Sequence, residues 1–465
     1  MKDLADFALK KLEEFKVDYA EVKLETTCGN GFLLKNGNLD VAGFDKINGL
    51  GIRYLINNNL GFVSINEFDK ETIKRIIEKS VRITKNGVKI GDKTYLSKDP
   101  AFKKDYEVKE KEKTQDLTAD KKIGFLMDLD KDLKDVAMRF FYLSDNITEK
   151  YYINTDGSRI TSKLPRIHFY AYLTIMHDNK TRQRYIPYGA CSGYECLKKW
   201  NLNEKLSKEY LALKENIKNG IKVKPGKYDV ICGPEVTGIA VHESAGHPYE
   251  ADRIFGREAA QAGESFITEK MIGTQIGAKD VTVVDDPTLE NSYGFFLYDD
   301  EGIKARRKFM IKDGIIKEFM HNRETAKQMN LESNGSARAS SYDKENLVRM
   351  SNTFMLPGNS SEEEIIKETK KGVFLKNFTE WNIDDKRYQQ KYVGCEAYLV
   401  ENGQITKPLI APALEITTPA FWKSIDMIGN KIELFAGSCG KSEPMQAIPV
   451  WMGGPVIRLK NIQIN

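Results

Sequence analysis

Helical and strand periodicities alternate along the first part of the chain. Apolar side chains recur at the spacing of one helix face over residues 4–15, which predicts an N-terminal helix. Two apolar runs follow, and each is broken by a turn signal, Asn36-Gly37 in the first and three asparagines at 57–59 in the second. Asparagine and glycine accept the left-handed conformations of tight turns, so two β-hairpins are expected. We therefore predict an N-terminal α+β domain over residues 1–98.

Residues 99–222 are predicted to form a middle segment. Its beginning, 99–113, is rich in lysine and glutamate and poor in apolar residues, which is typical of a linker or of an exposed helix start. Apolar spacing then predicts a helix around 123–133, strands over 140–186 and a closing helix over 203–216.

Residues 223–465 are predicted to form a larger C-terminal domain. A strand is expected at 227–232, and Pro234 is placed to begin a helix directly after it. Further hairpins are marked by the turn pairs Asp313-Gly314 and Asn402-Gly403. Many hairpins with occasional helices favour an α+β fold, with mixed and antiparallel sheets and flanking helices.

Composition excludes several classes of protein. The chain has 465 residues, of which 41% are hydrophobic, and a formal net charge of +4, so a disordered chain is disfavoured and no nucleic-acid partner is expected. No run approaches 18 apolar residues, so no membrane span is expected. The first six residues carry acids where a signal peptide would be basic, and six scattered cysteines are typical of reduced thiols. These features predict a cytoplasmic protein.

The helix predicted from Pro234 leads into a group of residues suited to hydrolytic metal chemistry. His242 and His247 offer imidazole ligands, and Glu243 offers a carboxylate beside the first of them. At five residues apart, the two histidines would lie about 140° apart around an ideal helix. They can share one ion only if the helix widens into a π-type turn or ends at the second histidine. Gly246 and Pro248 permit either distortion.

Two protein ligands seldom hold zinc, so a third is required. The spacing does not choose among the candidates downstream, which are Glu250, Asp252, Glu258, Glu264, His321, Cys395 and Cys439. The competing interpretation is that both histidines are ordinary residues of the protein core or surface.

Several motifs together resemble the TldD/PmbA family of metallopeptidases, and in particular its TldD branch. The segment HESAGHPYEAD at 242–252 is similar to that branch's H-E-x-x-x-H signature. The other matching segments are YDDEG at 298–302, RMSNTFMLPG at 349–358 and FAGSCGK at 435–441. The N-terminal hairpins also resemble the family's first domain, so the resemblance covers nearly the full chain.

This resemblance implies a zinc site in which His242, His247 and Cys439 are the ligands and Glu243 is the general base. It implies a zinc-dependent metallopeptidase whose catalytic site lies in the C-terminal domain. The many predicted strands favour binding of a peptide backbone at a sheet edge, so the expected substrates are peptides or unfolded, extended polypeptides. The resemblance also implies a homodimer, or a heterodimer with a metal-free TldE/PmbA-like subunit, because that branch lacks the metal motif.

Two other functions stay open at this stage. One is a non-catalytic peptide-binding or assembly subunit with a structural zinc, which would need a fourth protein ligand. The other is modulation of DNA gyrase, suggested by the family's older naming and disfavoured by the near-neutral charge. Cys191 and Cys196 are expected to be buried thiols, and the basic residues within 304–308 are expected on a solvated strand edge.

Overall fold

A curved sheet runs through the first 190 residues and is shared by the two segments that precede the C-terminal domain. The computed structural model describes residues 1–87, 93–258 and 263–464. The strands of this sheet are β1 Tyr19–Lys35, β2 Asn38–Ile56, β3 Asn59–Ile65, β4 Lys103–Glu107, β5 Met138–Asn154, β6 Arg159–His177 and β7 Lys180–Ala190. Over the described residues their order is β3-β2-β1-β5-β6-β4, and β7 also pairs with β6.

The predicted N-terminal hairpins are present, but their strands are much longer than local pattern indicates. The β1–β2 hairpin turns at Asn36-Gly37, where both residues adopt a left-handed backbone. β1 also pairs along its length with β5, so residues 1–98 and 99–222 share hydrogen bonds across one sheet. The expectation of a linker or helix start at 99–113 is wrong in part, because β4 lies there as a parallel strand on β6.

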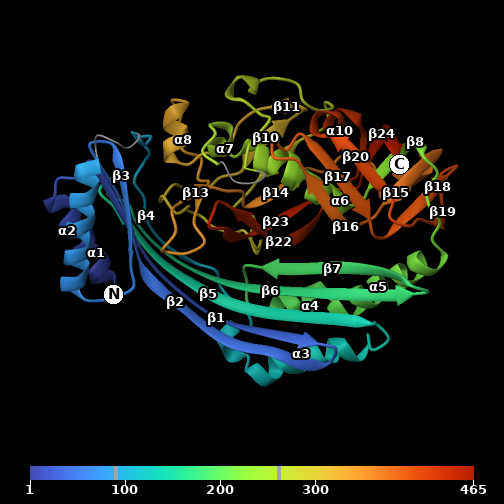
Figure 1. The fold of residues 1–465 in the computed structure, drawn as a ribbon, viewed down its shortest axis with the longest axis horizontal. Coiled ribbons are helices and arrows are strands. Elements are labelled where there is room, and N and C mark those ends of the chain that lie inside the picture. Colours follow the sequence, from blue (N-terminus) through green and yellow to red (C-terminus); the bar gives the residue numbers. More distant parts are fainter. Residues whose placement is uncertain (88–92, 259–262, 465) are drawn as a thin grey trace.

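Helices cover the outer face of this sheet in two groups (Figure 1). Their bounds are α1 Lys2–Glu14, α2 Lys70–Gly87, α3 Ala119–Lys131, α4 Glu195–Trp200 and α5 Leu202–Asn219, with a 3₁₀ turn at Thr114–Asp116. α1 and α2 share one hydrophobic core with β1, β2 and β3, and the helices α3 to α5 share another with β5, β6 and β7. The sheet therefore has two separate cores, one toward each end.

Two further sheets build the C-terminal part. The first contains β8 Gly226–Cys232, β15 Lys371–Leu375, β16 Phe378–Ile383, β17 Gln389–Gly394, β18 Ala397–Glu401, β19 Gln404–Pro408, β20 Ala413–Thr417, β21 Ile425–Ile428 and β24 Ile457–Ile464. The second contains β9 Val283–Asp285, β10 Lys308–Lys312, β11 Ile315–Ile316, β14 Asn352–Met355, β22 Glu433–Lys441 and β23 Gln446–Gly454. A short pair, β12 Ala337–Arg338 and β13 Leu347–Val348, lies apart from both.

The helix α6, Pro234–Val241, links these two sheets. It packs against β14, β22 and β23, and its buried residues belong to one core with strands of both sheets. The remaining helices are α7 Ala251–Ile254, α8 Arg323–Gln328, α9 Glu362–Lys367 and α10 Thr418–Ser424, with a 3₁₀ turn at Glu269–Met271. In Figure 1 this C-terminal part lies over the concave side of the long sheet, next to β7.

One sequence expectation about charge is wrong. Lys308 was expected on a solvated strand edge, but its side chain is fully buried and its ammonium lies 2.9 Å from a carboxylate oxygen of Asp285. A buried cation requires such a partner, since desolvation penalises an unpaired charge. Cys191 and Cys196 are buried, as expected. Among the described residues, no helix is long and apolar enough to cross a membrane.

Candidate metal centre

The helix that begins at Pro234 carries both histidines and widens between them. Beyond the α-helical part, His242–Gly246 form a π-helical turn in which the backbone N–H of His247 donates to the carbonyl of His242. A 3₁₀ turn over His247–Tyr249 ends the helix. The wider turn adds one residue, so the imidazoles lie on the same side with their centroids 4.8 Å apart. Both distortions that the spacing permits are present, because the turn between the histidines is π-type and the helix ends in the 3₁₀ turn that begins at His247.

Gly246 is required where this turn meets the rest of the domain. A Cβ atom at this position would lie 1.9 Å from the sulfur of Met350, a fully buried side chain in the segment that leads into β14. A side chain at this position would force Met350 or the turn to shift. The glycine therefore lets the backbone between the histidines approach the neighbouring segment closely.

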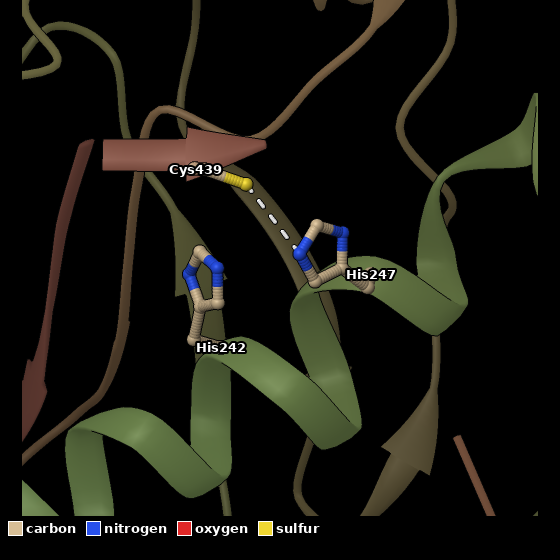
Figure 2. A group of neighbouring side chains, drawn as sticks. All are labelled: His242, His247 and Cys439. Carbon is tan, nitrogen blue, oxygen red and sulfur yellow. Dashed lines mark hydrogen bonds between the residues drawn. The ribbon is translucent and has the colours of Figure 1, made fainter. Parts of the chain in front are cut away.

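Cys439 comes to the two histidines from β22, far away in the sequence. Its sulfur lies 3.4 Å from Nε2 of His247, although the two residues are 192 positions apart. One ligand atom from each of the three side chains lies within 4.8 Å of the others, and all three residues are buried. Figure 2 shows the three side chains converging between the helix and the strand. Over the described parts of the chain, this is the one such group of potential metal ligands.

The other candidate ligands occupy different places. Their contacts are Glu250 with Nδ1 of His247 at 3.1 Å, Asp252 with Lys441 at 2.6 Å, Glu258 with Arg253 at 3.6 Å, Glu264 with Lys386 at 3.9 Å, His321 with Thr325 at 3.1 Å and Cys395 with the Gln183 carbonyl at 3.6 Å. Among these candidates, and within the described residues, Glu250 is the one that contacts a histidine of the pair. It does so on the ring nitrogen opposite the one that faces Cys439.

Glu250 therefore orients His247. Its carboxylate is fully buried and also accepts from Arg253, at 2.7 Å, and lies 3.2 Å from the ammonium of Lys441. Burial alone would raise the pKa of Glu250, but Lys441, His247 and Arg253 together hold it well below its usual range. A carboxylate on the far nitrogen of a metal-binding imidazole fixes the ring and makes the other nitrogen a better ligand.

The surroundings of Cys439 favour its thiolate form, which is the form that binds metal. Burial alone would raise the pKa of the Cys439 thiol, but the imidazoles of His247 and His242 and the guanidinium of Arg349 together hold it well below its usual range. Arg349 also donates to the carbonyl of Cys439 and, at 2.9 Å, to that of Gln446. Its side chain thus joins both strands of the β22–β23 hairpin and places the sulfur toward the histidines.

The donor set fits zinc. Thiolate and imidazole are ligands that zinc prefers, and tetrahedral zinc places neighbouring ligand atoms roughly 3.3–3.6 Å apart, close to the 3.4 Å between Cys439 and His247. Nδ1 of His242 is buried and has no hydrogen-bond partner among the described residues. Three protein ligands leave a fourth position open, which is the pattern of catalytic rather than structural zinc sites.

The three side chains line a cavity of about 530 Å³ between the long sheet and the C-terminal part. Among the strands that border it, β7, β16 and β22 each lie at an edge of their sheet in the described part of the chain. Aromatic side chains form much of its wall, among them Tyr172, Tyr185, Phe378, Trp381 and Phe435. The cavity is large enough for a small organic molecule or a short part of a larger one, and the candidate metal ligands form part of its wall.

Glu243 also lines this cavity and forms an ion pair there with Arg387. Its carboxylate contacts the guanidinium of Arg387, and both side chains are buried. Sequence reasoning identified Glu243 from its place beside His242 but missed Arg387, Glu250 as a partner of His247, and Arg349. Arg387 lies in a charged turn that has no motif, whereas Arg349 and Glu250 fall within the motifs that carry the family resemblance.

Comparisons with known proteins agree along the whole chain. Models of the PmbA/TldA metallopeptidases match in three successive parts: domain 1 over residues 20–84, the central domain over 112–214 and the C-terminal domain over 225–465. A metalloprotease of Methanocaldococcus jannaschii is 31% identical over 462 residues, covering 97% of this chain and 98% of that protein. A zinc metalloprotease TldD homolog of Saccharolobus solfataricus is 28% identical and covers 98% of each chain.

Solved structures share the fold. TldE from Thermococcus kodakarensis superposes with a TM-score of 0.77 at 17% identity, covering 100% of this chain and 99% of that one. A Thermotoga maritima protein gives a TM-score of 0.79 at 18% identity over the full length of both chains. These identities establish the α+β fold alone, and the sequence matches establish the relationship. The chain belongs to the PmbA/TldD family of metallopeptidases.

Proposed function

We propose that this chain is a zinc-dependent metallopeptidase that hydrolyses peptide bonds in unfolded or extended polypeptides. The observation that carries the proposal is the convergence of His242, His247 and Cys439 in one cavity with the carboxylate of Glu243. In the proposed site, the three side chains hold zinc and Glu243 is the general base. The names of the relatives, metalloprotease and zinc metalloprotease, support the reaction class.

The roles of the chain's own residues follow from their positions. Zinc, when bound, would polarise the scissile carbonyl and lower the pKa of water. Glu243 takes one proton from the water as its oxygen attacks the carbonyl carbon, and it later gives that proton to the leaving amine. Glu250 holds the ring of His247 in place, and Lys441 compensates the charge of Glu250 inside the protein. The proton therefore moves by way of one carboxylate in both halves of the reaction.

An extended substrate suits the borders of the cavity. An edge strand offers unpaired backbone groups, and a peptide can add to it as a further strand. β22 is such a strand and carries Cys439 itself, so pairing there would bring a peptide backbone beside the metal site. Recognition through backbone groups would make cleavage broad in sequence and dependent on an unfolded substrate. Efficient cleavage of a compact, stable domain would contradict this specificity.

The other candidate is a peptide-binding subunit with a structural zinc. A closed structural site has four protein ligands, whereas the group within the described residues has three. The open fourth position and the adjacent carboxylate of Glu243 favour hydrolysis over a structural role.

The decisive experiment compares Glu243→Ala with the wild-type chain in two measurements, zinc content and cleavage of an unfolded polypeptide. We expect unchanged zinc content and loss of cleavage, because the metal ligands stay and the base is removed. Glu264→Gln serves as the matched control, since this carboxylate is exposed and its ion pair is with Lys386 rather than with a histidine. Cleavage by Glu243→Ala at the wild-type rate would contradict the proposed mechanism.

The same proposal extends to assembly and location. By its resemblance to the TldD branch, the chain is proposed to work in the cytoplasm as a homodimer or with a metal-free TldE/PmbA-like subunit. Sedimentation of the purified chain, alone and with such a subunit, would distinguish the two assemblies. A monomer that cleaves peptides at full rate would contradict both.

A further inference from the structure

Arg387 is held in an unusual conformation at the edge of the cavity. It lies in the turn between β16 and β17 and has a φ of 63°, in the left-handed region that favours glycine. Holding a long side chain there costs about 1–3 kcal/mol. Its carbonyl accepts from the hydroxyl of Thr418 at 2.8 Å, and its N–H donates to the carbonyl of Asp384 at 3.0 Å. The backbone is thus fixed on both sides, which directs the side chain inward.

The guanidinium of Arg387 is the cation placed next to the reacting groups. It contacts the carboxylate of Glu243 and is buried with it. The other arginine in the cavity wall, Arg184, forms ion pairs with two carboxylates, those of Glu209 at 2.9 Å and Glu235 at 2.5 Å. The charge of Arg184 is therefore compensated away from the metal ligands, whereas that of Arg387 is directed at the proposed base.

We infer that Arg387 is a catalytic residue that donates a hydrogen bond to the oxyanion of the tetrahedral intermediate. This inference rests on the proposed peptidase function. When water attacks, a C–O bond forms, the carbonyl π pair moves to the carbonyl oxygen, and one water proton moves to Glu243. Negative charge thereby leaves the carboxylate and appears on an oxygen attached to the same carbon as the attacking oxygen.

The guanidinium of Arg387 lies beside Glu243, the carboxylate from which the negative charge is lost. The attacking oxygen lies within hydrogen-bond reach of Glu243, about 2.6–3.2 Å, and the oxyanion shares its carbon. The guanidinium that is paired with the carboxylate before attack then faces an oxyanion beside a neutral acid. A fixed cation in a buried site needs no reorganisation at this step, so its effect is larger in the transition state than in the ground state. When the C–N bond breaks, the π pair returns to carbon and the proton moves from Glu243 to the amine.

Arg387→Gly tests this role without straining the turn, because glycine readily adopts the left-handed backbone. We expect kcat to fall about 100- to 1,000-fold, with KM little changed and zinc content retained. Added guanidinium ion should restore part of the activity. Lys386→Ala is the matched control, because it removes a neighbouring cation of the same turn whose side chain is 64% exposed. It should leave kcat unchanged.

A binding measurement separates this role from mere positioning of Glu243. The probe is a phosphinic pseudopeptide, whose tetrahedral group carries the charge of the intermediate, bound to zinc-loaded Glu243→Gln protein. Adding Arg387→Gly should weaken its binding at least 10-fold, whereas Lys386→Ala should not. Equal binding with and without Arg387, or an unchanged kcat in Arg387→Gly, would overturn the inference. If the wild-type chain cleaves nothing, the proposed function fails, and the binding measurement still decides the role of Arg387.

Discussion

Replacing Gly246 with alanine tests whether the wide turn between the histidines is needed to bind metal. The new Cβ would lie 1.9 Å from the sulfur of Met350 and 3.1 Å from its terminal carbon, whereas non-bonded heavy atoms prefer about 3.5–4.0 Å. Overpacking of a core costs about 1–3 kcal/mol, and so severe an overlap places the expected loss near 3 kcal/mol. Either Met350 moves, or the turn shifts and separates His247 from His242.

Two assays distinguish these responses. Urea unfolding of the metal-free chain measures the loss in free energy of unfolding, and competition with a chromophoric chelator measures zinc affinity. Gly124→Ala is the matched control, since this residue of α3 has open space where its Cβ would lie. It should be neutral or stabilise the chain by up to about 1 kcal/mol. Gly246→Ala should lower the free energy of unfolding and reduce the affinity for zinc at least 10-fold.

The double variant tests the cause. Met350→Ala alone should cost about 2–5 kcal/mol through the cavity it leaves. In that background Gly246→Ala should cost little, because the atom it overlaps has been removed, and the coupling between the two changes should approach 3 kcal/mol. Strictly additive costs, or a Gly246→Ala chain with wild-type stability and zinc affinity, would refute the reasoning.

The remaining predictions concern single residues around the site and in the core. Cys439→Ala should reduce zinc content in metal analysis, and fully retained zinc would contradict the three-ligand site. Glu250→Gln should weaken zinc binding about 10- to 100-fold in the chelator assay, because His247 loses its charged partner; wild-type affinity would show that its orientation has another source. Lys308→Met should lower the free energy of unfolding by about 3–5 kcal/mol in urea, since it leaves Asp285 without its cation; a loss under 1 kcal/mol would count against the pair. Burial lowers the pKa of His321 from 6.5 to about 4, so the unfolded chain takes up this proton first as the pH falls. Stability should decrease between these pH values by up to about 3 kcal/mol, and His321→Gln should flatten that part of the pH profile; an unchanged profile would refute the assignment.

Local pattern predicts the elements of this fold better than their partners. The Asn36-Gly37 turn is visible in sequence because both residues must adopt left-handed conformations, and the structure has them at φ values of 48° and 80°. The pairing of β1 with β5 is not visible, because the two strands are joined by more than 100 residues and no local signal states which edges meet. The parallel strand β4 was missed for a related reason. Its side chains are mostly exposed, so it lacks the apolar alternation of a strand that covers a core.

The candidate site divides in the same way. His242, Glu243 and His247 belong to one helix, so their spacing indicates a metal site and a helix that either widens into a π-type turn or ends at the second histidine. Cys439 needed the family resemblance, because only the folded chain brings β22 to that helix. Arg387 had neither signal: a cation among charged turn residues is normally solvated, and its importance arises from a backbone that directs it to Glu243. The two histidines can thus be found from local chemistry, whereas Cys439 and Arg387 depend on neighbours that only the tertiary structure supplies. If Arg387→Gly and guanidinium rescue behave as expected, the strained turn at Arg387 is maintained for that chemistry rather than for the stability of the fold.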